Sequence, residues 1–113
     1  MERWFSAEYM ENEPEECDKV RNMIRKTKVF GFCGCCRAIQ GLDLTDRISA
    51  ITVPTQMIVG EDDPGTPVVA HEVMHEKIDG SELVVIPKAL HFSNVEQKDA
   101  FNDAYMTFLG KHS

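Results

Sequence analysis

The sequence has 113 residues, of which 42% are hydrophobic and 27% are charged, and this composition is typical of a single soluble globular domain. Its 12 lysines and arginines are outnumbered by 19 aspartates and glutamates, so the basic face that nucleic-acid binding requires is excluded. No apolar run approaches the roughly 20 residues that span a bilayer, and the N-terminus lacks the apolar core of a secretory signal. We therefore expect a cytoplasmic protein with no membrane partner.

The first part of the chain predicts two helices and a short polar turn. One helix begins near Pro14, because proline suits a first helical turn and the neighbouring glutamates oppose the helix dipole, and it runs to about Lys28. A second, shorter helix is expected from about Cys33 to Gln40. Its small residues predict close packing against a neighbouring element. A single polar turn follows at residues 43–48.

Three of the four cysteines, Cys33, Cys35 and Cys36, lie in this second helix. Without an export signal, reduced thiols are expected rather than disulfides. Structural zinc usually requires C-x2-C pairs repeated at a distance, and only one cluster occurs here. We interpret these cysteines as small hydrophobic residues of a packed helix, and metal binding by the cluster stays open.

From residue 51 onward the pattern alternates between strands and helices. Two short apolar runs, at 55–60 and 81–87, have the length and composition of buried parallel strands. Helical periodicity connects them at 69–78, where Gly80 provides a C-terminal cap. A last helix is expected at about 94–109, with one apolar face made by Phe101, Ala104, Tyr105, Phe108 and Leu109. The order predicts an α/β fold with a parallel sheet and a right-handed crossover.

The connecting helix contains His71-Glu72-Val73-Met74-His75, a match to the H-E-x-x-H zinc motif. Histidines at i and i+4 share a helix face and can bind one metal, while Glu72 could act on a bound water. The extended motif is absent, because Ile78 and Ser81 stand where glycine and histidine would be needed. A small zinc peptidase is therefore one alternative, and a solvated helix face is the other.

Polar residues also follow each predicted strand. Asp62 and Asp63 come directly after the first strand, and His91 follows the second. Ligands and catalytic groups gather at the carboxyl ends of parallel strands, so the acid and the histidine are expected to meet there. A carboxylate that accepts from one imidazole nitrogen leaves the other nitrogen free to act as a base.

At these residues the sequence resembles the C-terminal part of the α/β-hydrolase family, and within it the 3-oxoadipate enol-lactonases. The matching stretches extend over nearly the whole chain: Arg3-Trp4-Phe5, residues 31–39, Asp43-Leu44, Val53-Pro54-Thr55, residues 58–63, Thr66-Pro67, residues 78–81, residues 91–97 and Ala100-Phe101. The resemblance implies that residues 1–42 belong to a helical cap region and that residues 43–113 belong to the C-terminal part of the hydrolase core.

The resemblance also implies roles for particular residues. Asp63 matches the acid of a Ser-Asp-His triad, in preference to Asp62, because the family pattern places the acid three residues before Thr66-Pro67. His91 matches the base. Arg3 and Trp4 are candidates for substrate binding, where an arginine would suit the substrate's carboxylate. No metal or other cofactor is implied.

The main departure from the family is the absence of G-x-S-x-G, so the chain has no nucleophile elbow. We expect a lactone hydrolase of aromatic catabolism whose serine lies outside this chain, and we expect the chain alone to be inactive. The small-molecule partner would be the lactone. A non-catalytic chain that self-associates, or that pairs with a missing N-terminal portion, is the remaining alternative, since an incomplete sheet leaves an open edge.

Overall fold

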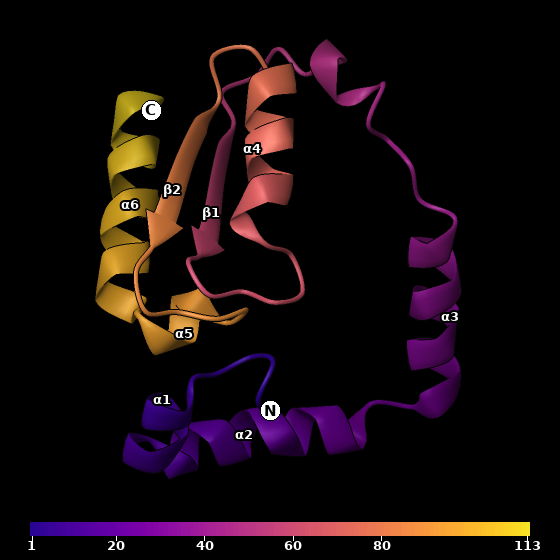
Figure 1. Ribbon diagram of the computed structural model, residues 1–113, viewed down its shortest axis with the longest axis vertical. Helices are drawn as coiled ribbons and strands as arrows, with labels where there is room; N and C mark the ends of the chain where they lie inside the picture. The colour runs from indigo at the N-terminus through magenta and orange to yellow at the C-terminus, as the bar shows by residue number, and fades with distance from the viewer.

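The computed structural model describes residues 1–113, and its C-terminal half contains two parallel strands flanked by helices (Figure 1). β1 (Gln56–Gly60) pairs with β2 (Glu82–Ile86) without a register shift, so that Ile58 lies opposite Val84. The crossover between the two strands is helix α4 (Val68–Lys77). The predicted α/β order and the parallel pairing are thereby confirmed.

Both strands are most deeply buried at their carboxyl ends. Val59, near the end of β1, is 3% exposed, and Ile86, the last residue of β2, is 2% exposed. Ala89, just beyond β2, is fully buried. These apolar side chains anchor the two strand ends, so the loops that leave them start from fixed positions.

Helix α4 agrees closely with the predicted helix between the strands. It begins after Pro67, and its last turn is followed by Ile78, which is buried. The chain then turns at Gly80, whose φ of +69° lies in the left-handed region that glycine tolerates without a steric cost. This turn directs the chain back into β2.

The single helix predicted at 94–109 is wrong in one respect, because the chain forms two helices there. α5 (Ser93–Glu96) ends at Gln97, whose φ of −123° and ψ of 53° are not helical, and α6 (Lys98–Lys111) begins immediately afterwards. The side-chain amide of Gln97 donates to the carbonyl oxygen of Lys88 at 3.2 Å. This bond to a distant loop accompanies the break, and helical periodicity cannot reveal it.

The N-terminal segment packs against the chain that follows β2. α2 (Pro14–Lys26) confirms the predicted first helix, with Pro14 in its first turn. The short helix α1 (Ala7–Asn12), capped by the Ser6 hydroxyl, was not predicted. A buried cluster of three residues contacts partly buried neighbours that include Phe92 and Val95; the cluster consists of Phe5, Cys17 and Val20.

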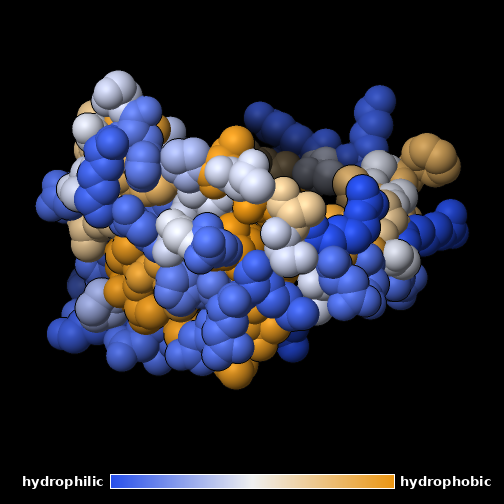
Figure 2. Space-filling view, turned by 90° about the horizontal axis from the view of Figure 1, so that it is seen from above, coloured by the Kyte–Doolittle hydropathy of each residue, from blue (hydrophilic) through white to orange (hydrophobic).

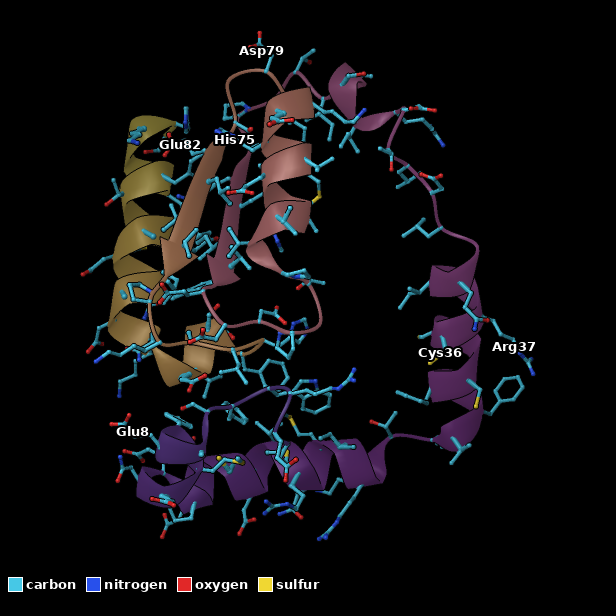
Figure 3. All side chains as sticks on the ribbon, in the orientation of Figure 1. Glu8, Cys36, Arg37, His75, Asp79 and Glu82 are labelled. Carbon is cyan, nitrogen blue, oxygen red and sulfur yellow. The ribbon has the colours of Figure 1, made fainter.

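Helix α3 (Val29–Gln40) starts four residues earlier than expected and stands apart from the strands (Figures 1 and 3). None of its residues is buried, and Cys33 and Cys35 are exposed. The expectation of a closely packed helix is therefore wrong within this chain, because no element of the chain covers α3. A turn at residues 45–47 falls within the polar turn predicted at 43–48, and the short helix η1 (Ile48–Ala50) then leads towards β1.

Much apolar surface remains exposed. Only 12 of the 113 residues are buried, and large apolar side chains such as Phe30, which is 90% exposed, face outward. Figure 2 shows apolar atoms reaching the surface between hydrophilic side chains on the face seen from above. No helix has both the length and the apolar character needed to cross a membrane.

Candidate active site

Two loops meet at the carboxyl ends of β1 and β2, where the sequence placed the candidate acid and base. The loop after β1 is bound to the chain after β2 by backbone hydrogen bonds: Glu61 N–H donates to the Ile86 carbonyl at 2.9 Å, and Asp62 N–H donates to the Ala89 carbonyl at 3.0 Å. These bonds continue the strand pairing beyond the sheet. The two loops are therefore held together, and we refer to the pair of joined loops as the polar platform.

Gly60 allows these loops to approach one another. A Cβ atom added at this position would lie 2.2 Å from the carbonyl oxygen of Leu90 and 2.4 Å from that of Ala89. Both distances are far shorter than any real contact of a Cβ atom, and the obstructing atoms are backbone. Only glycine fits here, and its presence brings the segment before His91 against the end of β1.

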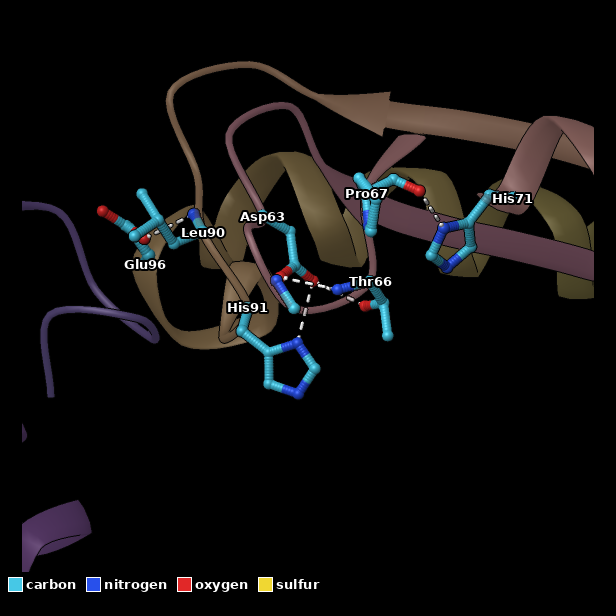
Figure 4. Close-up of polar contacts among 8 residues, drawn as sticks. Asp63, Thr66, Pro67, His71, Leu90, His91 and Glu96 are labelled. Atoms are coloured by element: carbon cyan, nitrogen blue, oxygen red, sulfur yellow. Dashed lines mark hydrogen bonds and ion pairs between the residues drawn. The ribbon is translucent and has the colours of Figure 1, made fainter. Parts of the chain in front are cut away.

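Asp63 and His91 are joined by a hydrogen bond across this platform (Figure 4). Nδ1 of His91 lies 2.8 Å from Oδ2 of Asp63. Nδ1–H donates to the carboxylate, so in the neutral ring Nε2 carries no proton and is available as a base. The Asp63 side chain is 3% exposed and the His91 side chain is 40% exposed, so the acid is enclosed while the imidazole is open to an incoming molecule.

Asp63 is held by three further hydrogen bonds. Its Oδ1 accepts from the backbone N–H groups of Gly65, at 2.7 Å, and Thr66, at 3.1 Å, and its Oδ2 accepts from the Thr66 hydroxyl at 2.7 Å. Burial acts to raise the pKa of Asp63, but the hydrogen bonds from His91, Thr66 and Gly65 together outweigh it and lower the pKa to about 2. The carboxylate is therefore ionised at neutral pH.

Asp62, the other candidate acid, takes a different position. It is exposed, and its side chain makes no hydrogen bond to His91. The structure thus brings His91 together with Asp63.

Lys88, in the loop that leads to His91, has a φ of 53°, an unusual value for a residue other than glycine and one that occurs often at functional loops.

Trp4 lies beside the loop that carries His91 and is bonded to it. The carbonyl oxygen of Trp4 accepts from the N–H of Phe92 at 3.1 Å, and the two rings are 5.1 Å apart between centroids. Arg3 is exposed and makes no hydrogen bond or ion pair. A largely apolar groove of about 330 Å³ opens next to the indole; it is lined by Trp4, Ile24, Thr27, Val29 and Phe32.

The H-E-x-x-H histidines lie apart from this pair and do not form a metal site. Nδ1 of His71 donates to the Pro67 carbonyl at 3.2 Å (Figure 4), and Nδ1 of His75 is hydrogen-bonded to the Ser81 hydroxyl at 2.8 Å. Ser81 precedes β2, so His75 sits at the opposite end of the sheet, as Figure 3 shows. No three His, Cys, Asp or Glu side chains are arranged to hold a metal ion, including the cysteine cluster. The zinc peptidase alternative has no support.

Sequence reasoning missed two residues that shape the site. Thr66 donates its hydroxyl to Asp63, and its position three residues after an aspartate was the available signal. Glu96 is 9% exposed and accepts hydrogen bonds from two separate segments of backbone. Nothing local in the sequence indicates these partners, because one of them is 90 positions away.

Known proteins similar to this chain are hydrolases. No protein-family model matches it. The 3-oxoadipate enol-lactonase 2 of Acinetobacter baylyi is 35% identical over 102 residues, which are 90% of this chain and 38% of that enzyme. The crystal structure of the enol-lactonase from Burkholderia xenovorans superposes with a TM-score of 0.92 at 33% identity, over 96% of this chain and 41% of that one.

A thermophilic esterase from Thermogutta terrifontis, solved with malate bound, superposes with a TM-score of 0.88 at 31% identity, over 96% of this chain and 40% of that one. The chain thus spans about two fifths of the length of these relatives. It matches the C-terminal part of their fold. In this chain, that part contains the two parallel strands and the loops that carry Asp63 and His91. The chain belongs to the α/β-hydrolase superfamily.

Proposed function

We propose that this chain supplies the acid and the base of a Ser-Asp-His triad that hydrolyses 3-oxoadipate enol-lactone to 3-oxoadipate in aromatic catabolism. The observation that carries the proposal is the 2.8 Å hydrogen bond between buried Asp63 and accessible His91 at the strand ends. The names of the similar proteins, an enol-lactonase and an esterase, support hydrolysis of a carboxylic ester. The nucleophilic serine is contributed by residues outside this chain, and the cytoplasm is the expected location.

The proposed steps follow from the geometry of the pair. The serine attacks the lactone carbonyl as Nε2 of His91 takes its proton, and His91 returns that proton to the ring oxygen as the lactone opens. His91 then removes a proton from water, which attacks the acyl-serine, and gives this proton to the departing serine oxygen as the product is released. The enol formed when the ring opened tautomerises to the ketone of 3-oxoadipate. Asp63 keeps the imidazole in the required tautomer and stabilises the imidazolium, a role that suits a carboxylate with a pKa near 2.

The charge around the site favours one side for the substrate. Grooves on the side of α1 and α5 are lined by several carboxylates, including Glu13, Glu16 and Asp99, which would repel an anionic lactone. The groove beside Trp4 is apolar. We assign the lactone ring to this groove and its carboxylate to Arg3, within a cap formed by residues 1–42.

A pair of adjacent aspartates provides the test. The chain is joined to, or mixed with, an N-terminal portion of an enol-lactonase that carries the nucleophile, and lactone hydrolysis is followed. We expect Asp63→Asn to lower kcat by about 10⁴-fold, because the imidazole loses its orienting carboxylate, and Asp62→Asn to retain most of the activity. Equal losses in both variants, or a larger loss in Asp62→Asn, would reject the assignment of the acid.

A further inference from the structure

Glu96 is a buried carboxylate for which the proposed triad gives no role. It is the last residue of α5 and is 9% exposed. No lysine or arginine pairs with it. An ionised group at such a position requires strong hydrogen bonds to offset the loss of hydration, so its partners indicate what it does.

The two carboxylate oxygens of Glu96 bind two segments that are far apart in the sequence. Oε1 accepts from the backbone N–H of Ser6 at 2.9 Å, and Oε2 accepts from the backbone N–H of Leu90 at 2.9 Å (Figure 4 shows the second bond). Leu90 immediately precedes His91, and Ser6 lies two residues after Trp4. Glu96 therefore connects the segment of the proposed base with the segment of the proposed substrate-binding side chain.

Other contacts between the two segments surround this connection. Phe92 donates its N–H to the Trp4 carbonyl at 3.1 Å, and its ring lies 5.1 Å from that of Trp4 and 5.4 Å from that of Phe5. These aromatic contacts bury apolar surface, but they are not directional, so the rings can shift relative to one another. The two bonds to one small carboxylate fix the distance between the segments, since both donors are backbone groups with little freedom.

We propose that Glu96 is a positioning residue, which holds the His91 loop and the Trp4 segment in a fixed relation so that base and substrate face the same space. This inference rests on the proposed function for the roles of His91 and Trp4. The arrangement requires a carboxylate: an amide has one acceptor oxygen, and its NH2 group would face the second N–H and leave that donor unpaired. Glutamine is therefore a close isostere that removes one bond.

Amide hydrogen exchange measured by NMR on this 113-residue chain tests the proposal without any requirement for lactonase activity. In Glu96→Gln we expect the exchange of the Ser6 amide, the Leu90 amide or both to rise by about tenfold or more, which corresponds to the loss of a charge-assisted hydrogen bond. The Val59 amide in β1 serves as the internal reference, because a general loss of stability would raise its exchange equally. Glu76→Gln, at an exposed carboxylate of α4 with no side-chain hydrogen bond, is the matched control.

A second readout separates positioning from a merely structural role. Joined to the nucleophile-bearing portion, Glu96→Gln should lower kcat and raise KM for the lactone, whereas Glu76→Gln should change neither. Protection of Ser6 and Leu90 as strong in Glu96→Gln as in the unmodified chain would overturn the proposal, as would a rise in exchange at Val59 as large as theirs. Failure of the completed protein to hydrolyse the lactone at all would instead reject the proposed function and leave the exchange result standing.

Discussion

At the scale of single residues, the site depends on how one carboxylate is held. Asp63 has four hydrogen-bond donors around it, from His91, the Thr66 hydroxyl and two backbone N–H groups. Together they outweigh the effect of burial and lower its pKa from 3.8 to about 2. The same interactions orient His91, so the residue that stabilises the local fold is also the one that prepares the proposed base.

This lowered pKa predicts a specific pH dependence of stability. A carboxyl group whose pKa is lower in the folded state stabilises the fold above its unfolded pKa of roughly 4, and this contribution disappears as the pH falls towards about 2. We expect Asp63→Asn to reduce the free energy of unfolding by about 2 kcal/mol at pH 7, and this deficit to shrink between about pH 4 and pH 2. Urea unfolding at several pH values measures both quantities.

Asp62→Asn is the control for that experiment, because Asp62 is exposed and makes no side-chain hydrogen bond. Its effect on the free energy of unfolding should be within about 0.5 kcal/mol and should not vary with pH. A deficit in Asp63→Asn that stays constant down to pH 2 would mean that the hydrogen bonds do not favour the ionised form of the carboxyl group.

At the scale of elements, the loops are positioned by the close approach of two strand ends. Gly60 ends β1 directly against the Ala89–Leu90 backbone, where no side chain fits. The bonds from Glu61 and Asp62 to the chain after β2 then carry the pairing into the loops. The distance between Asp63 and His91 is therefore set by the position of the two strand ends from which their loops begin.

Gly60→Ala should disturb both the stability and the site. The added methyl group would displace the backbone before His91, and overpacking of this kind costs about 1–3 kcal/mol. Gly110→Ala, in α6 with nothing within 4 Å of the added atom, should instead be neutral or stabilising. Thermal unfolding compares the two variants, and loss of the His91 Nδ1 proton signal in NMR spectra would report the separation from Asp63. A Gly60→Ala protein as stable as the unmodified chain would contradict this account of the junction.

The sequence predicts the elements whose formation is local and misses those that depend on distant contacts. Two apolar runs between turn residues predicted both strands, and the carboxyl-end rule for parallel sheets predicted the approach of Asp63 and His91. α1 was missed because its six residues have no apolar periodicity. The break at Gln97 was missed because it involves a bond to Lys88, and the role of Glu96 because it involves Ser6.

At the scale of the whole molecule, the chain combines a large exposed apolar surface with a hydrogen-bonded acid and histidine. It spans about two fifths of the length of its relatives, and large apolar side chains of α3 such as Phe30 and Phe32 are largely exposed. Asp63 and His91 are nevertheless in hydrogen-bond contact. The acid and the base of the proposed triad are thus brought together by residues of this chain alone.

The most direct test measures hydrolysis of 3-oxoadipate enol-lactone by the chain completed with a nucleophile-bearing N-terminal portion, in variants of two histidines. The account predicts that His91→Ala reduces kcat by about 10⁴-fold or more, while His71→Ala, which removes the first histidine of the H-E-x-x-H sequence, leaves it close to that of the unmodified protein. Activity retained in His91→Ala but lost in His71→Ala would contradict the central claim that this chain contributes the Asp63 and His91 pair to an ester hydrolase.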